Sequence, residues 1–253
     1  MSGLRNLALE IRDNSVSIGN SKNHETNLFE KFLSLITPLF FRRLLVTVIG
    51  YFFLAFGVVL IVKSDLGIAP VNAISFVMSI IFTADLGLMT AIIYTIYILL
   101  QLAILRKDFR FTSFLQLPMN FIFSFFLSLC MRIFTFQTPQ MYVLRLLCHL
   151  SAVVIVSFGI CIYLRARLPP LPPEGFILAV KQKSRMKLQN IKVTFDFTIM
   201  IIALIFSLVA AGRIIGMREG TFISMLAIGK TLGFFSKYLG PKIDTIFKLQ
   251  AGE

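Results

Sequence analysis

The stretch KSDLGIAPVNAISFVMS, residues 63–79, interrupts the first long apolar run of the chain. That run ends at Lys63-Ser64-Asp65, the chain turns through glycine and proline, and a second apolar stretch extends from Val71 to Phe82. A helix needs roughly 20 apolar residues to cross a bilayer, so residues 71–82 are too few to span it. A half-length apolar segment at this place requires an explanation.

The composition indicates a polytopic membrane protein. Of the 253 residues, 57% are hydrophobic and only 15% are charged, whereas a soluble domain carries about 25% charged residues. The net charge is +13, but the basic residues lie mostly in the gaps between apolar runs, as in the cytoplasmic loops of membrane proteins. No basic, aromatic-rich module of the kind that binds nucleic acid is present. We therefore expect a bilayer environment and no nucleic-acid partner.

Six apolar runs are long enough to predict transmembrane helices. They are residues 44–62, 88–105, 111–131, 143–164, 193–211 and 221–238. Before the first run, residues 1–27 are polar and predicted to be disordered, and residues 28–43 form an amphipathic segment predicted to lie at the membrane interface. Residues 241–253 form a short polar tail. Most lysines and arginines fall in the loops that would share one side with both termini, which predicts cytoplasmic termini.

A shift of the chain against itself by 102 residues (56 to 158) aligns two interrupted segments. FGVVLIVKSDLGIAPVNAISFVMS (56–79) meets FGICIYLRARLPPLPPEGFILAVK (158–181). The identical or similar pairs are Phe56-Gly57 with Phe158-Gly159, Lys63 with Arg165, Leu66 with Leu168, and Pro70 with Pro172.

This repeat predicts the fold class. The first half (44–134) and the second half (143–240) each hold three predicted spans, and because three is odd, the second half enters the membrane from the opposite side. We predict an all-α polytopic membrane protein with six transmembrane helices, arranged as two inverted three-helix repeats, each with a short re-entrant or interfacial helix.

The paired interruptions have two interpretations. In inverted-repeat transporters, broken helices at corresponding positions mark the substrate site, and the free N–H groups at the start of a short helix attract anions or polar headgroups. Pro70 and Pro173 suit the first turn of such helices. Alternatively, both segments lie on the membrane surface and PPLPP is a stiff spacer. The repeat favours the first interpretation.

Candidate substrate-binding residues follow from the interruptions and from polar groups within the spans. They are Gly67, Pro70, Asn72, Glu174, Gly175, Asp196, Thr221 and Lys230. Asn72 and Glu174 hold corresponding places, and both residue types also suit helix caps. Asp196 lies in the fifth span, where an acidic group is functional by default; its alternative is an interfacial pair with Lys192. Lys230, near the middle of the sixth span, is expected to be the most buried basic residue and to need a partner.

Arg145 and His149 share one face of the fourth span. A proton relay through His149 is one interpretation. The favoured interpretation is a structural hydrogen bond for His149 and an Arg145 that reaches outward to the interface. The three cysteines all lie in apolar runs and have no paired spacing, so we expect no disulfide, no metal site and no cofactor.

Several of these residues resemble a known family. The DLGIAP turn (65–70), the PPEG turn (172–175) and Gly220-Thr221 are similar to the YczE/YitT-like bacterial integral membrane proteins, over about residues 43–240. The matching places are Gly67, Pro70, Glu174, Gly175, Gly220 and Thr221. The resemblance implies a bacterial inner-membrane protein and no particular substrate. The family turn is usually followed by Trp-Asp, whereas this chain has Val71-Asn72, which puts a cation-carrying role at that place in doubt.

The function that the pattern favours is a secondary transporter or permease for a small solute, with anionic or zwitterionic cargo mildly favoured by the helix N-termini and Lys230. An enzyme is not expected, because the chain has no HExxH or GxSxG motif and only two histidines. The alternative is a non-transporting membrane protein that supports or regulates a partner complex. Expected partners are the lipid bilayer, anionic lipid at the basic loop 181–192 and an unidentified small solute; a homo-oligomer is left open.

Overall fold

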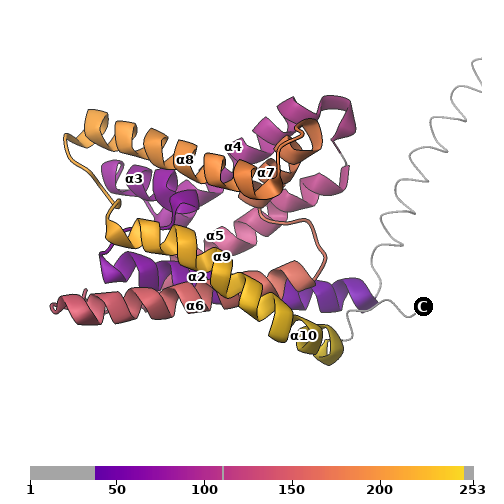
Figure 1. The fold of residues 1–253 in the computed structure, drawn as a ribbon, viewed down its shortest axis with the longest axis horizontal. Helices are drawn as coiled ribbons and strands as arrows, with labels where there is room; N and C mark the ends of the chain where they lie inside the picture. Colours follow the sequence, from indigo (N-terminus) through magenta and orange to yellow (C-terminus); the bar gives the residue numbers. More distant parts are fainter. Residues whose placement is uncertain (1–37, 110, 248–253) are drawn as a thin grey trace, which may run out of the picture. The chain divides into compact units, whose positions relative to one another are not determined.

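The computed structural model describes residues 38–109 and 111–247, and every regular element within them is a helix (Figure 1). The longer helices are α2 (Pro38–Ser64), α4 (Leu86–Leu105), α5 (Gln116–Ile133), α6 (Tyr142–Arg165), α8 (Leu188–Ala211) and α9 (Glu219–Tyr238). The shorter ones are α3 (Ala73–Ile81), α7 (Pro172–Lys183) and α10 (Gly240–Ile246), with 3-10 turns η1 (Pro70–Asn72), η2 (Arg106–Asp108) and η3 (Phe111–Leu115). The order long, short, long, long therefore occurs twice. The described residues from Arg43 onward form one compact unit, within which the helices pack together.

Five helices of the described chain are long and apolar enough to cross a membrane. They are Leu39–Ser64, Leu86–Asp108, Thr112–Ile133, Tyr142–Arg165 and Leu188–Ala211. These helices make the chain an integral membrane protein of the all-α class. The expected sixth span, α9, is not among the five. Its 20 residues are enough in length, but Lys230, Lys237 and several small polar residues make it less apolar than the others.

The two ends of the chain differ from the prediction or fall outside what is described. Residues 1–27 and most of the amphipathic segment 28–43 lie outside the described residues. The described part of that segment, from Pro38, is already the start of α2, so the first helix begins before residue 44. At the other end, part of the polar tail folds as α10, where Ile243 is buried and Asp244 forms an ion pair with Arg165 at 3.1 Å.

Helices α2 and α6 cross antiparallel at very short range. A Cβ atom on Gly159 would lie 2.5 Å from the backbone nitrogen of Leu54, and one on Gly57 would lie 2.8 Å from that of Val156. Because these atoms belong to backbone, only glycine allows the two helices to approach so closely. Leu54 and Val156 are 102 residues apart, as are Gly57 and Gly159, so the same contact is made twice with the roles of the two helices exchanged.

The connector from α2 to α3 is buried and irregular. Within it, the Ile68 N–H donates to the Gly216 carbonyl at 2.9 Å, and the Leu66 carbonyl accepts from the Gly220 N–H at 2.7 Å. Gly67 has φ +117°, and a Cβ there would meet the Thr221 hydroxyl, so glycine is required by both backbone and space. The loop before α9 thus supplies the partners that this interrupted backbone needs.

The two short helices pack between the same two long ones. Helix α3 contacts α4 and α8, and α7 contacts α4 and α8 as well. Because α2 and α6 are antiparallel, the connectors that leave their C-terminal ends start from opposite ends of the α2–α6 pair. Helices α3 and α7 therefore reach the interior of the unit from opposite ends.

The glycine crossing gives a stability prediction. Gly159→Ala places a methyl group against the backbone of α2, so we expect it to lower the free energy of unfolding by about 1–3 kcal/mol. The matched control is Gly233→Ala in α9, where nothing lies within 4 Å of the added Cβ and alanine favours the helix by up to about 1 kcal/mol. Thermal unfolding of detergent-purified variants measures both. Equal stability of the two variants would contradict the described crossing.

Candidate functional site

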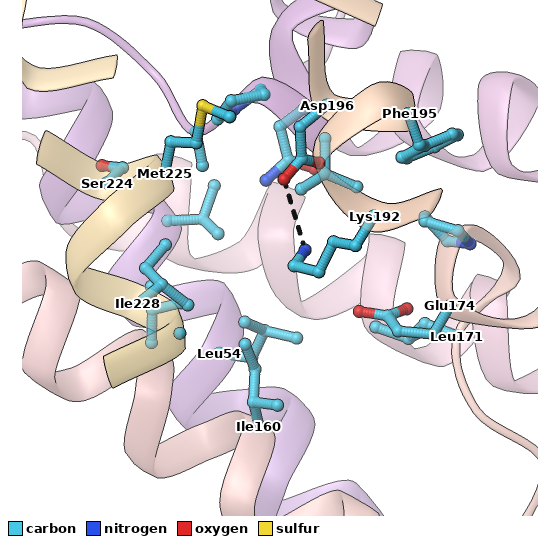
Figure 2. Close-up of a pocket in the computed structure, with 18 of the residues that line it drawn as sticks. Leu54, Ile160, Leu171, Glu174, Lys192, Phe195, Asp196, Ser224, Met225 and Ile228 are labelled. Atoms are coloured by element: carbon cyan, nitrogen blue, oxygen red, sulfur yellow. Dashed lines mark ion pairs between the residues drawn. The ribbon is translucent and has the colours of Figure 1, made fainter. Parts of the chain in front are cut away.

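A cavity of about 80 Å³ lies where the first turns of η1–α3 and α7 meet the long helices (Figure 2). Its wall takes side chains from α2, α4, α5, α6, α8 and α9. A water molecule occupies about 30 Å³ of liquid, so the space suits a few waters or a small solute and is far below the roughly 300–1,000 Å³ of drug-sized pockets. Most of the wall is apolar. Its side chains with polar or charged groups are Asn72, Tyr94, Glu174, Lys192, Asp196 and Ser224.

Much of the wall consists of residue pairs separated by 102 positions. In each pair, one residue comes from the part before residue 134 and the other from the part after residue 141. The pairs on the wall are Leu54 and Val156, Val58 and Ile160, Ala69 and Leu171, Val71 and Pro173, Asn72 and Glu174, Tyr94 and Asp196, and Phe123 and Met225. The shift seen in the sequence at 56–79 thus extends over α4 with α8 and α5 with α9.

The wall from the first half is neutral and internally bonded. Pro70 begins η1, where its missing N–H does no harm. Asn72 is buried, and its Oδ1 accepts a hydrogen bond from the Tyr94 hydroxyl at 2.9 Å. The predicted candidates Pro70 and Asn72 therefore both lie on the cavity, and Tyr94 joins them from α4.

The wall from α7 carries a carboxyl group with one oxygen that lacks a hydrogen bond. Leu171 caps α7, Pro172 and Pro173 form its first turn, and Glu174 follows. The Oε2 atom of Glu174 is buried and has no hydrogen-bond partner among the described residues. Tyr163 is near enough to act on this carboxyl, but its buried hydroxyl forms no hydrogen bond of regular geometry within the described chain. Burial raises the pKa of Glu174, and the Lys192 ammonium acts in the opposite direction.

Gly175 sets the position of α7. A Cβ atom there would lie 2.7 Å from Oε1 of Gln101 and 2.8 Å from Oε1 of Gln116. These two glutamines join α4 to α5 through reciprocal hydrogen bonds of 3.1 Å, and Gln101 also donates to the Pro172 carbonyl at 3.0 Å. Gly175 is therefore a close-approach residue behind the cavity, and the amide pair holds the start of α7.

Helix α8 contributes an ion pair. Nζ of Lys192 lies 3.4 Å from Oδ2 of Asp196; the Asp196 side chain is 7% exposed and the Lys192 side chain is 54% exposed. In the view of Figure 2, the Lys192 ammonium points toward Asp196, and the Glu174 carboxylate lies on its other side. Asp196 therefore lies on the interior cavity and also pairs with Lys192, so one geometric feature of each interpretation is present. The site holds two carboxylates and one ammonium.

Besides Gly175, three predicted site residues lie away from the cavity wall. Gly67 and Thr221 contact each other at the α2–α3 connector, where they support the backbone. Lys230 was expected to be the most buried basic residue, and this is wrong: its side chain is exposed. The reason is that the outer face of α9 carries it, on the same helix as Gly233, where nothing lies within 4 Å of an added Cβ.

His149 and Arg145 occupy structural networks near one end of α6. The His149 ring is fully buried; its Nδ1 lies 3.0 Å from the Ser64 hydroxyl, and its Nε2 lies 2.9 Å from both the Gly220 carbonyl and the Ser224 hydroxyl. Arg145 pairs with Asp65 at 3.1 Å. The hydrogen bonds of His149 fit its structural interpretation, whereas Arg145, which was expected to reach outward to the interface, is held by Asp65 and by the Pro139 carbonyl. Within the described chain, no group of three or more His, Cys, Asp or Glu is arranged to hold a metal ion.

Sequence reasoning treated Lys192 only as a partner of Asp196 and missed Tyr94 as a site residue. A signal for Tyr94 was present, since it stands 102 residues before Asp196. Thr90 likewise stands 102 residues before Lys192. Continuing the alignment into the long helices would have brought Tyr94 into the candidate site.

A family model described as a family of unknown function (DUF6198) matches residues 41–237. The chain belongs to this family. The range matched by DUF6198 includes the whole wall of the cavity, so the candidate site lies within the part that defines the family. No curated protein and no solved structure matches the chain.

The α8 ion pair gives a second prediction. Lys192→Met leaves the buried Asp196 carboxylate without its cation, and we expect a loss of about 1–3 kcal/mol in the free energy of unfolding. Asp196→Asn leaves a lysine that still reaches water, so its cost is expected to stay below about 1 kcal/mol. Thermal unfolding in detergent measures both, with the double variant as the control, because it removes both charges and should recover most of the loss. A larger cost for Asp196→Asn than for Lys192→Met would contradict the described burial.

Proposed function

We propose that the protein is a secondary transporter or permease for a small polar solute, and that the solute binds in the central cavity. The observation that carries this proposal is the pairing of the cavity wall, in which Asn72 and Glu174 come from the first turns of two short helices at corresponding places. Transporters built from inverted repeats place the substrate where interrupted helices of the two halves meet. The small volume of the cavity favours a small solute.

The proposed architecture is a pair of inverted repeats. The contact of Gly57 with Val156 is repeated as that of Leu54 with Gly159, and the packing of α3 on α8 is repeated as that of α7 on α4. Such exchanged contacts are expected for a two-fold relation between halves. Since α2 and α6 are antiparallel, the axis of that relation would lie across the helices, in the membrane plane.

In this architecture α9 is the sixth span and the counterpart of α5. At 1.5 Å per residue its 20 residues extend about 30 Å, which matches the hydrocarbon thickness. The lysine on its outer face, Lys230, would reach toward the interface. Helices α3 and α7 would begin inside the membrane, where irregular backbone is tolerated because protein or a wet cavity satisfies it.

The charges of the site favour a solute with a cationic group, zwitterions included. Glu174 and Asp196 supply two carboxylates against the single ammonium of Lys192. The expectation of an anionic solute depended partly on Lys230, which does not reach the cavity. A solute ammonium facing Glu174 would instead supply a partner for the carboxylate oxygen that lacks one.

The cellular location and the membrane orientation are also proposals. We propose a bacterial inner-membrane location with both termini cytoplasmic, on the distribution of lysine and arginine and the resemblance to YczE/YitT-like proteins. The alternative of a regulatory protein that binds a partner or anionic lipid depends on the loop 181–192. In that loop Lys183 pairs with Asp108 at 2.6 Å and Lys181 donates to the Met186 carbonyl, so part of its charge is used within the chain.

Side-specific cysteine labelling separates transport from a surface role. Asn72→Cys and Glu174→Cys are made separately in a protein whose native cysteines are replaced, and a membrane-impermeant thiol reagent is added from each side in turn. If one cavity opens alternately to both sides, each cysteine reacts from both sides. If the short helices lie on opposite surfaces, each cysteine reacts from one side only.

Two exposed loop positions serve as matched controls for this labelling. Gln137 lies between α5 and α6, and Arg185 lies between α7 and α8. Cysteines placed there are expected to react from one side each, and from opposite sides. Single-sided labelling at positions 72 and 174 like that of the controls would exclude alternating access.

A further inference from the structure

We propose that Glu174 is the proton-binding site of the empty cavity: its carboxyl group carries a proton that an incoming solute cation displaces. This inference rests on the proposed function and deepens it by naming the coupling ion. Because the proposal concerns only the protonation of the Glu174 side chain, it can be tested without knowing the solute.

One oxygen of the Glu174 carboxyl group lacks a partner. Oε2 is buried and has no hydrogen-bond partner among the described residues. An ionised carboxylate in such a place bears much of the cost of leaving water, unless a cation compensates it. Intramembrane carboxylates of transporters commonly serve as proton-binding groups. A bound proton would therefore remove the charge that Glu174 has to bury.

The cation nearest to Glu174 on the wall is already paired. Lys192 is the one basic residue on the described cavity wall, and its ammonium pairs with Asp196 at 3.4 Å. Figure 2 shows this pair, with Glu174 outside it. One ammonium offsets one carboxylate, so one acidic group is left over. Protonation of Glu174 makes the cavity electrically neutral.

The other groups around Glu174 are suited to a carboxyl group in either state. The titratable or charged groups that act on it are Tyr51 from α2, Tyr94 from α4, Tyr163 from α6, and Lys192 and Asp196 from α8. Helices α5 and α9 contribute only neutral groups to this wall, including Phe123 and Ser224. The hydroxyls of Tyr51 and Tyr163 are buried without hydrogen bonds among the described residues. They are thus free to donate to a carboxylate or to accept from a carboxylic acid.

The corresponding residue in the other half cannot do the same. Asn72 stands 102 residues before Glu174, and its amide Oδ1 already accepts from Tyr94. An amide does not titrate in this range, and Asp196 has its lysine. Glu174 is therefore the single carboxyl group on the described wall that lacks an ion pair.

The exchange balances in protons and charge. Water on one side of the membrane supplies a proton to a Glu174 oxygen, which forms an O–H bond and removes the negative charge. When a solute cation enters, that O–H bond breaks, the proton leaves to water, and the carboxylate pairs with the cation. One proton is exchanged for one positive charge, so the binding step is electroneutral.

Infrared spectroscopy of the full-length protein in lipid, with no solute added, tests the proposal. The spectrum of the wild type is compared with the spectra of variants. We expect a protonated-carboxyl C=O band at neutral pH that is absent from Glu174→Gln and retained in the double variant Lys192→Met/Asp196→Asn, which removes both members of the ion pair. The glutamine side chain has the size of a protonated glutamate and no charge, so the variant is expected to fold. A spectrum without such a band, or a band unchanged in Glu174→Gln, would overturn the proposal.

The pH dependence of stability gives a second readout. A group whose pKa is higher in the folded than in the unfolded protein contributes stability at low pH, and this contribution is lost as the pH rises through the folded value. Wild type is therefore expected to lose stability toward alkaline pH relative to Glu174→Gln. Parallel stability profiles would contradict the proposal. If the cysteines at positions 72 and 174 react from both sides but Glu174 is not protonated, the proposal of transport is retained and only the proposal of proton coupling fails.

Discussion

The constraint on which the structure depends is that an interrupted backbone inside a membrane must find its hydrogen-bond partners within the protein. The two halves solve this differently. The first connector pairs Leu66 and Ile68 with the backbone of Gly220 and Gly216, whereas the second is rich in prolines, which have no N–H to satisfy. Both solutions let a short helix begin in the interior. The cavity exists because these two helix starts meet there.

The scaffold of the site is duplicated, but its chemistry is not. Among residues related by the 102-residue shift, Asn72 corresponds to Glu174, Tyr94 to Asp196 and Thr90 to Lys192. The carboxyl and ammonium groups of the described wall all come from the second half, and their counterparts are neutral. A cavity shared by two similar halves thus acquires an asymmetric charge distribution. This asymmetry leaves one carboxylate, that of Glu174, as the group open to a proton or a solute.

Features that depend on the backbone could be predicted from the sequence. Length limits and prolines predicted both short helices, and the shift of 102 residues predicted that Asn72 and Glu174 correspond, before their shared cavity was known. Side-chain direction was harder. Lys230 lies in a helix whose sequence does not tell which face is packed, so its burial was predicted wrongly. Lys192 gained its role because α8 is turned toward the cavity, which depends on packing against α3 and α7.

The central claim is that two inverted copies place one cavity, with a few polar groups on its wall, at mid-membrane. An experimental structure of the protein in a lipid nanodisc tests it most directly. We predict that residues 43–133 superpose on residues 145–235 after a half-turn about an axis in the membrane plane, with Asn72 and Glu174 at the same depth near the bilayer centre. A structure in which α3 and α7 lie flat on opposite headgroup layers, with lipid or packed apolar side chains between them, would contradict it.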